Sequence, residues 1–421
     1  MSTGLTTLAE GIRIAIEALR ANKLRSSLTI LGVAVGVSVV VLMAALITGI
    51  RTSIMSGVES AGPKNFIVMR WDVTAVRIVN DGNDRPPWWN RPPLEPEEAE
   101  RIAEQPAIEE ALFNFGFQVT VDYGSDRVSG VGAQGYSAGW PRYADGDFVA
   151  GRDFIPAEVR ASRAVVVITR ALAEDLLGPI DPIGRRIGLT VPWRRTREEF
   201  TVIGVFEPAE NIFTGATPHY AVVPYTAASK RLKVDDSQAQ ILVVPADSAS
   251  QALAMDEVTE VMRATRRLGP REENDFSLLR SDQIIEIFDE LTRVFFLIML
   301  ALSSAGLMVG GVGVIGIMLI SVTERTREIG VRKAVGATRR EILWQFLVEA
   351  GLMTLIGGAV GMALGAAGAE GVEAWTPLPA AIPMWAVAAA LTMAVVTGML
   401  FGLLPAYRAS RLEPVDALRF E

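Results

Sequence analysis

The sequence predicts a membrane protein of four transmembrane α-helices, with a large extracytoplasmic α/β domain between the first helix and the second. Three observations lead to this fold class. Four long runs contain no charged residue, basic residues gather beside these runs on one side, and the stretch between the first two runs reads as ordinary water-soluble sequence. Half of the 421 residues are hydrophobic, and the excess is concentrated in the four runs.

Each uncharged run is long enough to cross a bilayer, because about 20 residues at 1.5 Å rise span the roughly 30 Å hydrocarbon core. The first run is longer than the apolar region of a signal peptide and starts farther from the N-terminus, so we expect it to be retained as an anchor. The runs occupy residues 28–50, 294–322, 350–369 and 380–407. We therefore predict transmembrane helices over 28–50, 286–322 including a stalk, 344–369 and 380–407.

The distribution of basic residues predicts the orientation. Arginine and lysine recur in the N-terminal segment 1–27, in the loop 323–343 and in the tail 408–421. The short loop between the third and fourth runs has Glu370 and Glu373 and no basic residue. By the positive-inside rule, both termini and the 323–343 loop lie in the cytoplasm, and the 51–285 domain lies outside.

The N-terminal segment has the pattern of a helix that lies on the membrane surface. Leu8, Ile12 and Ile16 form an apolar stripe at helical spacing, and Arg13 and Arg20 lie on the opposite face. We expect this amphipathic helix within residues 1–27.

The outer domain contains two units of strand, helix and strand, which predict a small sheet with helices on one side. A β-rich insertion, at about residues 125–235, separates the two units. We expect strands at 65–70, 115–123, 240–244 and 276–279, helices at 95–105 and 250–267, and insertion strands at 164–168, 200–205 and 221–223.

Both helices that adjoin the outer domain extend beyond their uncharged runs. The first is expected to continue outward until Gly62-Pro63 stops it. Before the second run, Ile284, Ile287, Leu291 and Phe295 recur at intervals of three and four, which predicts one continuous helix that enters the bilayer as a stalk. The same apolar stripe fits ordinary core packing, and both interpretations stay open.

Several classes of function are excluded or disfavoured. The sequence has no cysteine and one histidine, so disulfides and thiolate metal sites are excluded, and we predict no metal site. No G-x-x-x-x-G-K-[ST] loop, H-E-x-x-H helix or EF-hand loop is present, so we expect no ATP site and no catalytic residues in this chain. The acidic outer domain and its compartment disfavour nucleic acid.

The centres of the runs carry no ionisable residue, which argues against an ion-coupled transporter. Glu349, at the edge of the third run, is expected to snorkel and to have no transport role. Each run carries small residues spaced four apart, which let helices approach closely. We predict helix packing at Gly32, Gly36, Gly306, Gly310, Gly357, Gly361, Gly398 and Gly402.

The loop after the second run is the most informative stretch. Charges of alternating sign between Glu324 and Glu328 support a short surface helix, and Gly336 is placed to end it. Thr338 and Glu341 match a capping box for the next helix. We expect a helix on the membrane face that offers charge, and the apolar residues Ile329, Val331 and Val335, to a partner.

The loop 321–350 closely resembles the signature of FtsX-like permeases, in particular those of the MacB type. The tail, Gly402-Leu403-Leu404-Pro405-Ala406 and 411–418, resembles the C-terminal pattern of the same family. Gly151-Arg152-Asp153-Phe154 and the 164–168 and 200–205 segments resemble the MacB-like periplasmic core. The resemblance covers nearly the whole chain.

The resemblance implies the permease subunit of an ABC transporter of the mechanotransmission type, which serves export or efflux, in the cytoplasmic (inner) membrane of a bacterium. It implies a partner ATPase subunit that holds ATP and Mg, a second permease (another copy of this chain or a sister permease), a periplasmic adaptor protein and membrane lipid as partners, with no cofactor on this chain. Unlike full-length MacB, the sequence has no N-terminal ATPase, so we expect another chain to supply it. The implied coupling residues are Thr323, Glu324, Arg325, Thr326, Arg327, Glu328, Ile329, Gly330, Arg332, Lys333, Gly336 and Ala337.

Other functions fit the same fold. A lipoprotein-releasing permease or an ATPase-linked regulator of a cell-wall hydrolase would share it, because fold does not fix function. A membrane receptor without an ATPase is an alternative of another class. Charge reversal at Arg327 or Arg332 separates the receptor from the ATPase-coupled functions.

Overall fold

The computed structural model describes residues 23–72, 90–193, 196–209, 218–376 and 378–419. The chain forms two compact units, and each is described by itself below. Unit 1 comprises Met1–Arg51 and Glu290–Glu421, and unit 2 comprises Thr52–Asp289. The predicted amphipathic helix lies almost wholly outside the described residues.

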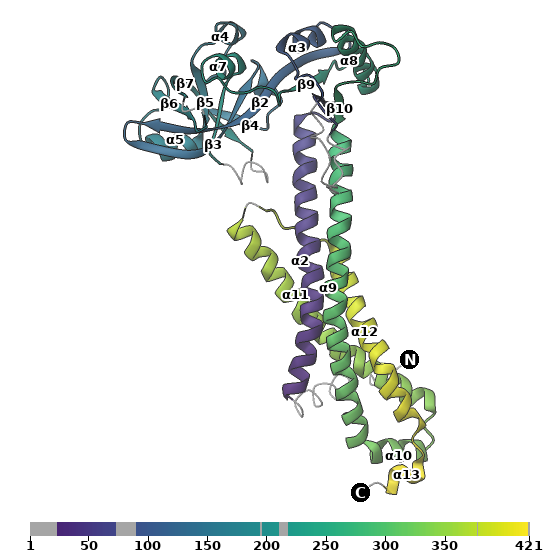
Figure 1. Ribbon diagram of the computed structural model, residues 1–421. Helices are drawn as coiled ribbons and strands as arrows, with labels where there is room; N and C mark the ends of the chain where they lie inside the picture. Colours follow the sequence, from purple (N-terminus) through teal and green to yellow (C-terminus); the bar gives the residue numbers. More distant parts are fainter. Residues whose placement is uncertain (1–22, 73–89, 194–195, 210–217, 377, 420–421) are drawn as a thin grey trace. The chain divides into compact units, whose positions relative to one another are not determined.

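Unit 1 consists of helices (Figure 1). Among the described residues, four helices are long and apolar enough to cross a membrane, which confirms the predicted transmembrane fold. They are α2 (Lys23–Ala61), α9 (Ser281–Glu324), α11 (Arg339–Trp375) and α12 (Met384–Arg411). The described part of unit 1 also contains two short helices, α10 (Thr326–Ala334) between α9 and α11, and α13 (Pro414–Arg419) after α12.

The helix ends follow local chemistry. As predicted, α2 ends just before Gly62, whose φ of 103° belongs to the left-handed region that favours glycine. The predicted continuity of the stalk is confirmed, since α9 is one helix from Ser281 onward. The fourth helix begins at Met384, four residues later than its apolar run, because Pro383 disfavours helical geometry in the residue before it.

Unit 2 is an α/β domain built on one sheet. Its strands run in the order β10-β1-β9-β2-β3-β8-β5-β7-β4, and β6 pairs with both β2 and β7. The strands are β1 (Phe66–Met69), β2 (Ile108–Tyr123), β3 (Asp126–Tyr136), β4 (Gly146–Gly151), β5 (Val165–Thr169), β6 (Arg186–Val191), β7 (Thr196–Pro208), β8 (Tyr220–Pro224), β9 (Gln240–Pro245) and β10 (Ser277–Arg280). The helices among the described residues are α3 (Pro96–Ala103), α4 (Pro156–Arg160), α5 (Arg170–Leu177), α7 (Tyr225–Lys230) and α8 (Gln251–Thr265), with a 3₁₀ turn η2 (Trp140–Arg142).

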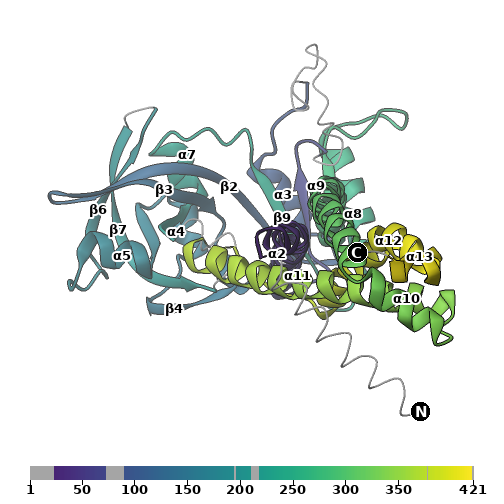
Figure 2. The same ribbon diagram turned by 90° about the horizontal axis from the view of Figure 1, so that it is seen from below.

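The predicted strands and helices of the two repeated units are present, but their sheet is larger than expected. The strands of the insertion, β3 to β8, belong to the same sheet as β1, β9 and β10. The long strand β2 joins the two parts, because it pairs with β9 through its first half and with β3 through its second half. Figure 2 shows β2 running between the two groups of strands.

The ends of the two long helices are tied together within unit 2. Strand β10 leads directly into α9, and β1 follows α2 after a four-residue turn. These two strands are neighbours, with Phe66 opposite Arg280, and Ser281 Oγ donates to the Asn65 carbonyl oxygen at 3.0 Å. Any shift between the two helix ends therefore acts on one strand pair.

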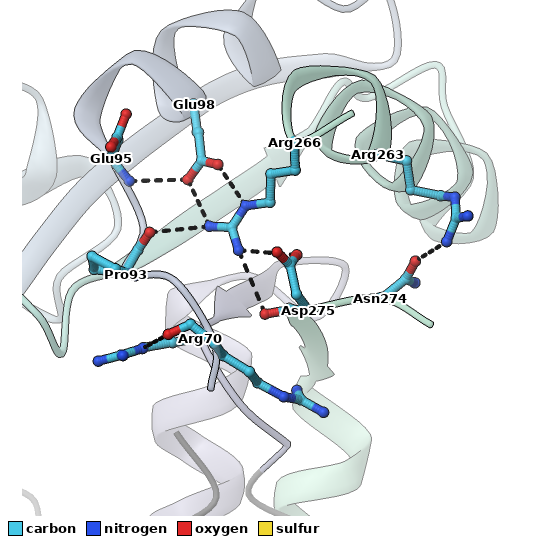
Figure 3. A network of polar contacts seen from close by, with 9 residues as sticks. Arg70, Pro93, Glu95, Glu98, Arg263, Arg266, Asn274 and Asp275 are labelled. Atoms are coloured by element: carbon cyan, nitrogen blue, oxygen red, sulfur yellow. Dashed lines mark hydrogen bonds and ion pairs between the residues drawn. The ribbon is translucent and has the colours of Figure 1, made fainter. Parts of the chain in front are cut away.

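A buried ion pair joins the two helices that cover this part of the sheet (Figure 3). Arg266, at the end of α8, donates to both carboxylate oxygens of Glu98 on α3, at 2.7 and 3.0 Å. The guanidinium also lies 3.0 Å from Asp275 and donates to the Pro93 carbonyl oxygen. Both partners of the main pair have side chains only 6% exposed. Because the charges satisfy each other, the pair fixes α3 against α8.

Candidate functional site

The loop that joins α9 and α11 contains the predicted coupling residues, and it forms the short helix α10 followed by a turn. Helix α10 ends as predicted, with Gly336 at φ 110° directly after its C-cap Val335. The predicted capping box is also confirmed. Thr338 Oγ1 accepts from the Glu341 backbone N–H, and Glu341 accepts from the Thr338 N–H at 2.8 Å. The connection between α10 and α11 is therefore a rigid turn.

One face of α10 is buried. Ile329 packs into an apolar cluster with residues of α9, α11 and α12, among them Met318, Phe346 and Ala406. The expectation that Ile329 faces a partner is wrong, since its side chain is 2% exposed. The reason is that the ends of α9, α11 and α12 meet on this side of α10 and bury Ile329, and the sequence of α10 alone does not show this contact. Thr326 and Gly330 share the buried face.

Three of the predicted coupling residues bind neighbouring helices. Arg325 lies 3.5 Å from Glu349 on α11, and Arg332 donates to Gln345 on α11 at 2.9 Å. Lys333 Nζ donates to carbonyl oxygens at the end of α12. The expectation that Glu349 snorkels is also wrong, because its side chain is 2% exposed and lies against Arg325, the residue that precedes α10.

The opposite face of α10 is open. Arg327 and Val331 lie one turn apart on it, and Val335 follows at the end of the helix with 85% of its surface exposed. We call Arg327, Val331 and Val335 the docking face. Two exposed valines beside an arginine are typical of a surface that contacts another protein, whereas a solvated connector would carry mainly polar residues here.

The structure thus divides the predicted coupling residues into two groups. Thr323, Glu324, Arg327, Glu328 and Gly336 are exposed. Arg325, Thr326, Ile329, Gly330, Arg332, Lys333 and Ala337 are buried or half-buried. The inward group holds α10 in place, and the outward group is available to a partner.

The predicted packing glycines lie where helices of unit 1 come closest. A Cβ at Gly32 of α2 would lie 2.8 Å from the backbone nitrogen of Gly310 on α9, and one at Gly306 would lie 3.0 Å from Cα of Gly36. Ser303 Oγ donates to the Gly36 carbonyl oxygen at 2.8 Å, which adds a polar tie to this contact. Helix α2 therefore packs on α9 almost backbone to backbone.

The other predicted glycines bring α11 into contact with two helices. Gly357 and Gly361 face α2, where a Cβ at Gly361 would meet Val37 at 2.8 Å. Gly398 and Gly402 of α12 face α11, both against Ala350. All eight positions thus lie at helix contacts in which a larger residue would force the backbones apart.

We expected no G-x-S-x-G pattern in this chain, and as a statement about the sequence this expectation is wrong. Residues Gly135 to Gly139, read GYSAG, match the G-x-S-x-G pattern of serine hydrolases. The match is structural here, because Ser137 Oγ bonds both backbone groups of Phe113 at 3.1 and 3.2 Å, and the residue is not in a strained left-handed conformation. The single histidine, His219, pairs instead with Asp175 at 2.7 Å. The described residues hold no group of three or more acidic or histidine side chains fit for a metal.

Comparison with known proteins agrees with these features. Residues 26–261 match the family described as MacB-like periplasmic core domain, and residues 295–414 match the family described as FtsX-like permease C-terminal. A curated relative, the macrolide export ATP-binding/permease protein MacB 1/2 of Paracoccus denitrificans, is 33% identical over an alignment that covers 99% of this chain and 59% of the relative. MacB of Neisseria meningitidis serogroup A, with the same description, is 32% identical over 97% of this chain and 60% of its own length.

Among solved structures, the periplasmic region of MacB from Actinobacillus actinomycetemcomitans is similar to this chain with a TM-score of 0.44 and 16% identity. The match covers 56% of this chain and 97% of that one. The chain spans about three fifths of the length of the two curated relatives, at 59% and 60%. On the two family matches, which together cover most of its length, the chain belongs to the MacB-type FtsX-like permeases.

Proposed function

We propose that this chain is the permease subunit of an ABC transporter of the mechanotransmission type, and that a partner subunit binds and hydrolyses the ATP. The observation that carries the proposal is the docking face, an exposed apolar and basic surface on a helix that is itself fixed to three others. The curated relatives are named ATP-binding/permease proteins, and this chain matches about three fifths of each. This supports an ATP-binding domain as the partner.

The packing within unit 1 supports the transmission of a movement from α10 to the long helices. A push on α10 reaches α9 through the single residue between them, Arg325, and reaches α11 through the Arg325–Glu349 and Arg332–Gln345 contacts. The glycine contacts hold α2 against α9, so these helices would move together. In unit 2, the same two helices continue into the neighbouring strands β1 and β10.

We propose the following orientation and partners for the assembled transporter. Both termini and α10 lie in the cytoplasm, by the distribution of basic residues, and unit 2 lies outside the membrane. Two copies of the chain act together, ATP and Mg²⁺ are held by the partner subunit, and a periplasmic adaptor receives the cargo. The work done is export, with macrolides as the first candidate cargo, on the names of the relatives.

The experiment that tests this function is a pull-down with matched variants. The tagged chain would be purified in detergent from membranes of its native host, and ATP hydrolysis would be assayed in the eluate. The docking variant combines Arg327→Glu with Val331→Asp. The control variant combines Arg160→Glu with Val149→Asp, two exposed residues of unit 2, where Val149 is 45% exposed against 47% for Val331.

We expect the wild-type chain and the control variant to bring down an ATPase, and the docking variant to lose at least about nine tenths of it. A tenfold loss corresponds to about 1.4 kcal/mol of binding free energy, a modest effect for a reversed charge and a buried polar group at an interface. If the wild type brings down no ATPase, or the docking variant retains it, the proposed function is wrong.

A further inference from the structure

Lys333 was expected to face a partner, but its ammonium group points into the protein. Nζ donates to the carbonyl oxygens of Ser410 and Leu412, both at 2.7 Å. Helix α12 ends at Arg411, so these two carbonyls belong to the group at a helix C-terminus that has no partner within the helix. A lysine satisfies such carbonyls and interacts favourably with the negative end of the helix dipole. We call this contact the Lys333 cap.

The cap joins parts of the chain that are far apart in sequence. Lys333 is separated from its two acceptors by 77 and 79 residues. The ammonium is half-buried, and loss of water around it lowers the pKa of Lys333, with a further decrease from the nearby positive charge of Arg339. A lysine gives up hydration in this way only where acceptors replace the lost water. The two short bonds to carbonyl oxygens supply that replacement.

Immediately beyond the cap, the chain forms α13, which packs against α10. Ala417 of α13 is fully buried, and its backbone N–H donates to the Glu413 carbonyl oxygen at 2.9 Å. Figures 1 and 2 both show α13 beside α10. A six-residue helix is too short to be stable alone, so α13 depends on this contact for its position.

Helix α13 also carries an exposed apolar side chain. Val415 is 66% exposed, a value between those of Val331 and Val335 on α10. Two adjacent helices therefore each expose valine, and exposed apolar side chains gathered on neighbouring elements mark contact surfaces. The partner that fits such a surface is the one proposed above for the docking face, an ATP-binding domain.

We propose that Lys333 is a positioning residue that fastens α13 to α10, and that the two helices together form the surface on which the ATP-binding partner docks. This inference rests on the proposed function and extends it from one helix to two. It assigns to the C-terminal segment, Leu412 to Arg419, a part in partner binding that the loop alone was expected to have.

The fastening is tested by a distance measurement that needs no partner. The chain has no cysteine, so Val335→Cys and Val415→Cys introduce the only two sites for spin labels. The distance between the labels would be measured in detergent by pulsed electron paramagnetic resonance. The test variant is Lys333→Met, which keeps the apolar stem and removes the ammonium. The matched control is Lys230→Met, at an exposed lysine of α7 in unit 2.

The labelled chain would be mixed with an excess of unlabelled chain, so that each complex carries labels on one copy only. We then expect one narrow distance distribution for the labelled parent and for Lys230→Met, and a broader distribution shifted to longer distances for Lys333→Met. Size-exclusion elution and thermal unfolding would be followed in parallel, because a general loss of folding would change them as well. If Lys333→Met leaves the distance distribution unchanged, the fastening role is wrong.

The docking role is tested in the chain without labels. With the ATPase that the wild type brings down as the probe, we expect Lys333→Met to weaken its binding about tenfold, and Lys333→Arg to keep most of it. If the distances broaden but the ATPase binds as before, α13 is not part of the docking surface. If the wild type binds no ATPase, the proposed function fails, and so does the docking part of this inference, whereas the distance measurement still decides the fastening.

Discussion

The interiors of the two units are packed in opposite ways. The core of unit 2 is made of large side chains, among them the fully buried Phe66, Phe113 and Phe200. Unit 1 joins its long helices through glycines, at contacts where even a methyl group would clash. In water, burial of apolar area drives folding, so large side chains contribute most. In lipid this drive between helices is absent, and close backbone contact takes its place.

The largest effect should follow from removing a large side chain in unit 2. Phe113 contacts the rings of Phe115 and Tyr225, with centroids 6.1 and 5.1 Å away. Phe113→Ala should lower the free energy of unfolding of unit 2 by about 3 to 5 kcal/mol, because it leaves a cavity in the core. Hydrogen exchange of peptides from β2 and β3 would measure the loss. Unchanged exchange would mean that the core does not depend on this side chain.

Breaking the buried ion pair of unit 2 should have a similar cost. Arg266→Met leaves the carboxylate of Glu98 buried without its main partner, which should destabilise unit 2 by about 3 to 5 kcal/mol. The double variant with Glu98→Gln should recover part of the loss, since residue 98 then carries no charge, whereas Asp275 still loses its contact with Arg266. Hydrogen exchange in α3 and α8 measures both. A double variant as unstable as Arg266→Met would show that the packing of the arginine stem matters more than charge.

A smaller effect is expected from adding a methyl group to unit 1. Gly310→Ala places Cβ 2.8 Å from the backbone nitrogen of Val33, so α2 and α9 must separate, at a cost of about 1 to 3 kcal/mol. The control is Gly371→Ala on α11, where no atom lies within 4 Å of the new Cβ and alanine favours the helix. Thermal unfolding in detergent should show a lower midpoint for the first variant alone. Equal midpoints would contradict the close packing.

The smallest effect concerns acid stability of unit 2. A hydrogen bond from Arg152 holds the pKa of Glu158 below its ordinary value of 4.5. A lowered folded-state pKa contributes stability that is present above the ordinary value and is lost as the pH falls through the folded-state value. Glu158→Gln should remove this contribution, which is about 1 kcal/mol because Arg152 is half exposed to water. Below pH 4.5, the stability of α4 measured by hydrogen exchange should therefore depend less on pH in the variant than in the wild type.

Sequence alone predicted the elements with strong local signals. The four spans, the end of α2 at Gly62-Pro63 and the Thr338–Glu341 capping box depend on residues close together in the chain, and all are confirmed. The division of α10 into two faces was not predictable in the same way. Whether Ile329 is buried depends on Phe346 and Ala406, which belong to other helices.

Polar contacts between residues far apart in the chain could not be predicted from the sequence either. A lysine in the middle of the basic loop 323–343 looks like a solvated charge. Its acceptors at Ser410 and Leu412 are backbone carbonyl groups, which the side-chain pattern of the sequence does not reveal. The joining of the insertion to the main sheet depends on β2, whose first half, from Ile108 to Asn114, was not recognised as strand. Glu109 and Glu110 in that half interrupt its apolar pattern.

The central claim is that ATP binding by a partner moves the outer domain through the helices of unit 1. The most direct measurement places one spin label per chain at Ser125→Cys, in the exposed turn between β2 and β3, in the purified complex with its ATPase. The account predicts a distance between the two copies that changes when ATP is added, and no change when the chain also carries Arg327→Glu with Val331→Asp. A distance that ATP does not alter, or the absence of any dipolar signal between copies, would contradict it.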